Sequence, residues 1–71
     1  MPKIPAITPK QIIKKLKKIG FADIRMKGSH VQLKKGNLLV TVPFHNGDLK
    51  AETLKSILRQ AKMTIEELIA I

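Results

Sequence analysis

Residues 30–42 of the chain, HVQLKKGNLLVTV, contain two alternating runs that flank the turn formers Gly36 and Asn37. Apolar residues at every second position are typical of a strand with one buried face, and a two-residue loop with Gly first is typical of a hairpin. A slip by one residue would place apolar side chains opposite polar ones, so the pattern favours one register. The pairs predicted in this register are Lys35 with Leu38, Leu33 with Val40, and Val31 with Val42.

The other face of the predicted hairpin is mainly polar. His30 would start its strand directly across from Pro43, so the loop that carries His45 would begin beside it. Leu39 also falls on this face and is an exception that the alternation does not explain. The polar residues expected here are His30, Gln32, Lys34 and Thr41.

A further strand is predicted just before the hairpin. Ile24 and Met26 alternate with charged residues, which is typical of a short, half-buried strand. Gly28 and Ser29 then form the turn into the hairpin.

Helices are predicted on both sides of the strands. Thr8 and Pro9 are good residues for a helix start, and Gly20 suits the position just after its end. A second helix has an apolar face through Ala51, Leu54, Ile57, Leu58 and Ala61, and a capping box at Thr64 starts a short last helix that runs to Ile71.

The element order α–β–β–β–α–α predicts an α+β fold with a three-stranded antiparallel sheet. Each helix has one apolar stripe and the sheet has one apolar face, so the helices should pack on the same side. The opposite face should stay open, with His30 projecting from it. Residues 1–71 are expected to form a single domain, with residues 1–7 as a loosely ordered N-terminal segment.

Positive charge dominates the composition. The 71 residues include 14 Lys and Arg against 5 Asp and Glu, a net charge of +9, and the whole excess lies in residues 1–35. Such asymmetry favours a polyanionic partner such as nucleic acid over a merely solvated surface. Five lysines crowd the predicted first helix, and no nearby acid is expected to balance them: Lys10, Lys14, Lys15, Lys17 and Lys18. A purely structural helix would normally alternate its charges, so this face is interpreted as a phosphate-binding one.

Several classes of function are disfavoured. With no Cys, disulfides and thiolate metal sites are excluded, and a reducing cytoplasm is the expected location. The only imidazoles, His30 and His45, have no metal-ligand spacing, so neither a metal nor another cofactor is expected. No apolar run is long enough for a membrane span, and no membrane partner is expected.

His30 is weighed between a surface histidine and an acid–base residue. Its place after a Gly-Ser turn, on a polar face and among cations, makes the acid–base interpretation as good as that of a surface histidine. In such RNA chemistry one group takes the 2′-OH proton and a second group protonates the leaving 5′-oxygen. His45 could be that second group or could orient the substrate.

Three motifs together resemble the HicA family of small toxins that cleave mRNA: RMKGSH (residues 25–30), VTVPFH (40–45) and LKSILRQA (54–61). The resemblance covers about residues 8–68 and implies a fold like that of double-stranded-RNA-binding domains. It also implies a metal-independent endoribonuclease with His30 as the essential histidine, and a HicB antitoxin that covers this site. Many members carry a second His where this chain has Val31, a predicted core position.

The expected RNA contacts combine the helix and the sheet: Lys14, Lys15, Lys18, Arg25, Lys27, Ser29, Gln32 and Lys34. The alternative is a non-catalytic RNA-binding module of the same fold, which would bind A-form RNA by shape and phosphate contacts. A double-stranded-RNA binder of this fold should carry a cluster of lysines at the start of its last long helix. Here the start of the second helix (residues 48–52, DLKAE) is nearly neutral, which argues against this alternative. Scarce aromatics also argue against single-strand binding by base stacking. A structural role in a ribosome-like particle has only the charge in its favour.

Overall fold

The computed structural model describes residues 6–71 and has the predicted order of elements. The bounds are α1 (Pro9–Lys18), β1 (Ala22–Lys27), β2 (His30–Lys35), β3 (Leu38–Pro43), α2 (Ala51–Ala61) and α3 (Ile65–Ile69). Within the described residues, no helix is long and apolar enough to pass through a membrane.

The ends of the helices follow the local sequence signals. The Thr8 hydroxyl accepts a hydrogen bond from the Gln11 N–H, and the Gln11 side chain accepts one from the Thr8 N–H, which satisfies two amides at the start of α1. Gly20, just past the end of this helix, has a φ of +108°. The predicted capping box of α3 is confirmed by the reciprocal hydrogen bonds between Thr64 and Glu67.

The sheet is antiparallel in the order β1-β2-β3, and the predicted hairpin register is confirmed. Lys35 pairs with Leu38 at the turn, and His30 pairs with Pro43 at the far end of β2. Leu39 is 48% exposed, so the exception in the alternation is real.

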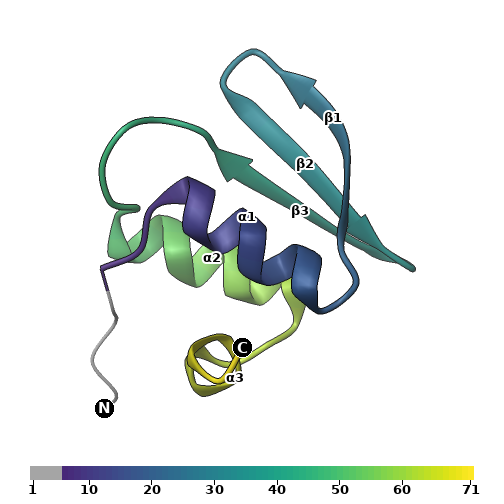
Figure 1. Cartoon of the computed structure of the whole chain (residues 1–71), viewed down its shortest axis with the longest axis vertical. Coiled ribbons are helices and arrows are strands. Elements are labelled where there is room, and N and C mark those ends of the chain that lie inside the picture. Colours follow the sequence, from purple (N-terminus) through teal and green to yellow (C-terminus); the bar gives the residue numbers. More distant parts are fainter. Residues whose placement is uncertain (1–5) are drawn as a thin grey trace.

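The molecule has two layers, a sheet and the helices α1 and α2 that cover one of its faces (Figure 1). One hydrophobic core lies between the layers, and its fully buried side chains include Ile12, Leu16, Leu33, Val40, Leu54 and Ile57. The opposite face of the sheet is open, as predicted. This α–β–β–β–α layout is that of double-stranded-RNA-binding domains.

The prediction that β1 is half buried is wrong, because all six of its residues are exposed. Ile24 lies at an irregularity between Asp23 and Arg25 that interrupts the alternation, and it is 54% exposed. Met26 pairs with Val31 and so shares its face, yet it remains 62% exposed. The β1–β2 end of the sheet extends beyond the helices (Figure 1), so little covers this part of the helix-facing side.

The N-terminal segment differs in part from the prediction of loose order. Residues 1–5 lie outside the described residues. Ile7, however, is only 4% exposed and belongs to the core, and its carbonyl accepts a hydrogen bond of 2.8 Å from the Leu49 N–H. This bond ties the start of α1 to the residues that precede α2.

The outer edge of β3 is attached to α2 through Gln60. The Gln60 Oε1 accepts a hydrogen bond of 2.8 Å from the Thr41 N–H, and its Nε2 lies 3.3 Å from the Ser56 hydroxyl. A strand edge normally leaves such amides unpaired. Gln60 therefore satisfies one edge amide and fixes the sheet against the helix layer.

Candidate functional site

The turn between β1 and β2 positions His30. Gly28 has a φ of +60°, in the left-handed region that glycine adopts without a steric penalty, and the pairing of Lys27 with His30 closes the turn. On the other side, the Phe44 N–H donates a 2.6 Å hydrogen bond to the Ser29 carbonyl. His30 is thus held between two neighbouring strands, and it is exposed.

The open face around His30 is basic. Residues directly opposite each other in an antiparallel sheet share a face, with Cβ atoms about 5 Å apart. By this rule Lys27 is the direct neighbour of His30, and Arg25 is the direct neighbour of Gln32. The face therefore carries five of the predicted contact or catalytic residues, namely Arg25, Lys27, His30, Gln32 and Lys34.

His45 lies in the loop after β3, close in sequence to the residue that pairs with His30. Its Nδ1 is 3.0 Å from the carbonyl oxygen of Asn46. A carbonyl can only accept, so this contact is a hydrogen bond when Nδ1 carries the proton, and Nε2 is then the nitrogen left for a substrate. His45 is exposed, and the hydrogen bond would orient its ring.

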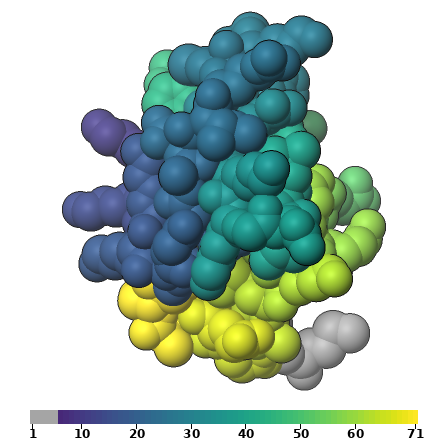
Figure 2. Space-filling view, turned by 90° about the vertical axis from the view of Figure 1, so that its right-hand side faces the viewer, coloured from purple at the N-terminus to yellow at the C-terminus, as the bar shows by residue number. Residues whose placement is uncertain are grey.

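The predicted lysines of α1 lie in the other layer. Lys14 and Lys18 are exposed on the helix, which packs against the face of the sheet opposite to His30. Figure 2 shows side chains of α1 projecting to one side of the molecule, next to the β1 region. The basic residues that the sequence predicts as one RNA-binding set therefore form two surfaces, one on the sheet and one on α1.

Two lysines of α1 have partners within the fold. The Lys15 Nζ donates hydrogen bonds to main-chain oxygens of Ile71 and Leu68, at 3.2 and 3.5 Å. The Lys17 Nζ lies 3.2 Å from an Asp23 carboxylate oxygen, and this hydrogen bond is the main reason that the pKa of Asp23 is lowered. The expectation that no acid balances these lysines is therefore wrong for Lys17, because its partner comes from β1.

Two side-chain contacts join elements that are far apart in the chain, and the sequence did not predict them. Lys15 reaches α3, and Gln60 reaches β3, across 53 and 19 residues respectively. Neither has a local signal, since a lysine on a basic helix and a glutamine on an exposed helix face look like ordinary surface residues. In the described residues, no three His, Asp or Glu side chains gather in a way that could hold a metal ion.

A search of curated proteins found no match to the chain. A family model described as the HicA toxin of bacterial toxin–antitoxin systems matches residues 9–63. The match begins with α1, continues through the sheet and α2, and includes the turn before His30 and the loop of His45. Because it covers most of the 71 residues, the chain belongs to the HicA toxin family, whose members are the toxins of bacterial toxin–antitoxin pairs.

Proposed function

We propose that this toxin is a metal-independent endoribonuclease that cleaves mRNA, with His30 as the acid–base residue, and that a HicB-type antitoxin inhibits it. The observation that carries the proposal is the position of His30. It is an exposed imidazole held by a Gly-Ser turn on a basic sheet face, with Lys27 directly opposite. Membership of the HicA family supports the same conclusion.

The proposed reaction is an internal transesterification. His30 removes the proton of a ribose 2′-OH, and the 2′-oxygen attacks the adjacent phosphorus. The bond from phosphorus to the 5′-oxygen breaks, and a second group or water protonates the leaving oxygen. The products are a 2′,3′-cyclic phosphate and a 5′-OH end. Such proton transfers need no metal ion, and a positioned acid–base group contributes about 10²–10⁴-fold to the rate.

The neighbours of His30 suit the remaining tasks. Lys27, which pairs with His30 across the two strands, would stabilise the negative charge that develops on the phosphoryl oxygens. Arg25, Gln32 and Lys34 lie along the same face and would hold the RNA strand on either side of the scissile bond, together with Ser29 in the turn. His45, oriented by its contact with Asn46, would donate the second proton or position the substrate.

The test is to identify the cleavage products of an RNA oligonucleotide in EDTA. Cleavage should persist in EDTA and should leave 2′,3′-cyclic phosphate ends. An oligonucleotide whose 2′-OH groups are replaced by 2′-O-methyl groups should resist cleavage, because the internal nucleophile is lost. Cleavage of the methylated RNA, or 5′-phosphate ends, would show that water attacks instead and would exclude this role of His30.

A further inference from the structure

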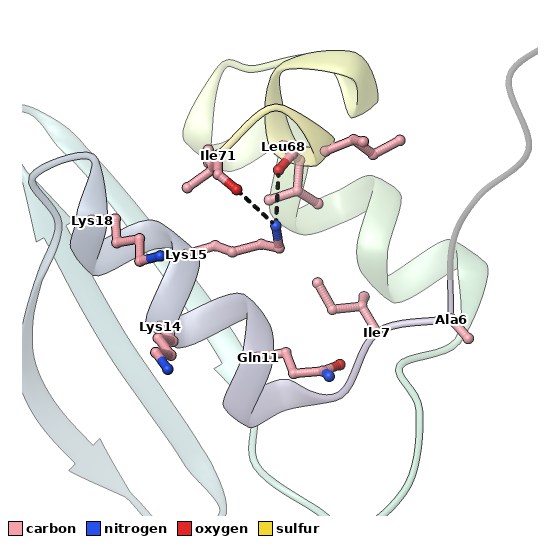
Figure 3. A pocket seen from close by; sticks show the side chains of 9 residues that line it. Ala6, Ile7, Gln11, Lys14, Lys15, Lys18, Leu68 and Ile71 are labelled. Carbon is pink, nitrogen blue, oxygen red and sulfur yellow. Dashed lines mark hydrogen bonds between the residues drawn. The ribbon is translucent and has the colours of Figure 1, made fainter.

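A cavity of about 390 Å³ lies between α1 and α3, on the helix layer and away from the open sheet face. Figure 3 shows its walls, with Ile7 from the segment before α1 on one side and Leu68 and Ile71 from the C-terminal part on another. Ile69 also lines it and is 54% exposed, although most large aliphatic side chains of α1 and α2 are buried. Ile69 therefore gives the cavity apolar surface that nothing in the described residues covers, whereas Ile7 and Leu68 are buried and form its floor.

Cations border this apolar surface. Lys14, Lys15 and Lys18 line the cavity from α1, and none of the other described side chains that line it is charged. Lys15 crosses to the C-terminal part, where its ammonium donates hydrogen bonds to main-chain oxygens of Leu68 in α3 and of Ile71 just after it (Figure 3). This contact fixes the α3 wall relative to α1, while Lys14 and Lys18 remain exposed to a ligand.

The α3 wall is also separate from the family match. That match ends at residue 63, whereas α3 begins at Ile65. The α1 wall of the cavity lies within the match and the α3 wall lies outside it, and the match assigns the cavity no role.

We propose that the α1–α3 cavity is a docking site for an acidic protein segment with an apolar anchor side chain. The anchor would fill the space between Ile7, Leu68 and Ile69, and carboxylates beside it would pair with Lys14 and Lys18. The charge of the lining favours this occupant, because the charged side chains that line the cavity among the described residues are all lysines. The antitoxin is the partner expected to supply the segment, and only this identification rests on the proposed function.

A segment docked in the cavity would affect RNA binding through Lys14 and Lys18. Lys14 and Lys18 are also expected to bind RNA phosphates, so a segment in the cavity and an RNA strand on α1 would compete for the same ammonium groups. Docking of this segment would thus weaken RNA binding separately from the expected covering of His30, which lies on the other face of the sheet.

The experiment uses the full chain labelled with nitrogen-15 and an acetylated, amidated peptide of sequence ELEDLLE as the probe. Amide shifts in α1 and α3 should map the peptide to the cavity, and the uncharged peptide QLQNLLQ should bind at least about fivefold more weakly, because its interaction with the lysines is lost. Ile69→Ser should also weaken binding of the charged peptide at least about fivefold. Ile24→Ser is the matched control, because Ile24 is equally exposed but lies on β1.

A second variant covers the case in which Ile69→Ser disturbs α3. Lys18→Gln leaves the apolar walls intact and should also reduce affinity for the charged peptide. The proposal is overturned if the peptide does not bind the wild type, binds both variants as tightly, or shifts amides of the open sheet face instead. Equal binding of the uncharged peptide would also overturn it, since the lysines would then have no part.

Failure of this inference can be distinguished from failure of the proposed function. Peptide binding needs neither RNA nor His30, so a His30→Ala protein should bind the peptide as the wild type does. Conversely, Ile69→Ser should retain RNA cleavage, because it removes only the anchor site. In a competition assay, saturating peptide should lower RNA affinity for the wild type and have a smaller effect on Ile69→Ser at the same concentration.

Discussion

Single residues of the same type have different roles here because of what lies across from them in the fold. Lys14, Lys15 and Lys18 all belong to α1, yet only Lys15 is half buried and bonded to main-chain oxygens of the C-terminal segment. A cation near the last carbonyls of a helix is stabilising, since these groups lack partners within the helix and form the negative end of its dipole. Lys15 is thus a link between α1 and α3 as well as a positive charge.

Replacing Lys15 tests this link. Lys15→Met keeps the aliphatic stem but removes the donor, and should lower the free energy of unfolding by about 0.5–1.5 kcal/mol. Lys14→Met, on the exposed side of the same helix, is the control and should change stability by less. Urea denaturation of both variants measures the difference. Equal stabilities would mean that the contact of Lys15 with α3 contributes nothing to folding.

Among the helices and strands, the sequence pattern predicted features that depend on neighbouring residues, such as strand register. It did not predict features that depend on which part of the sheet the helices cover. The β2–β3 register follows from the alternation and from a two-residue turn, both contained in residues 30–42. The exposure of Ile24 and Met26 depends on the irregularity in β1 and on how far the helices reach over the sheet. Of the candidate site, the meeting of His30 with Pro43 was predictable, whereas the contacts of Lys15 and Gln60 needed the three-dimensional structure.

The role of the α1 surface in RNA binding can be measured through salt dependence. Each lost phosphate contact should lower the slope of log affinity against log salt by about 0.7–0.9. The double variant Lys14→Gln and Lys18→Gln should therefore show a smaller slope than the wild type by about 1.4–1.8. Lys55→Gln, an exposed lysine of α2, is the matched control and should leave the slope unchanged. An unchanged slope in the double variant would confine RNA to the sheet face.

For the molecule as a whole, the net charge of +9 determines the expected partner. An acidic antitoxin would place carboxylates where RNA phosphates otherwise bind, and the opposite charges would accelerate association at low salt. Mixing toxin and antitoxin should stop RNA decay at saturation, with an association rate that falls as salt rises. Continued cleavage by the saturated complex would contradict the proposed inhibition.

The most direct test of the account is RNA cleavage and growth arrest by His30→Ala beside the wild type. His30 is exposed, whereas Leu33 of the same strand is buried in the core. The variant should therefore fold, which circular dichroism would confirm. We predict that it still binds RNA but loses activity by about 10²-fold or more and no longer arrests growth. A folded His30→Ala protein that cleaves RNA at the wild-type rate would contradict the account and favour a non-catalytic RNA-binding module.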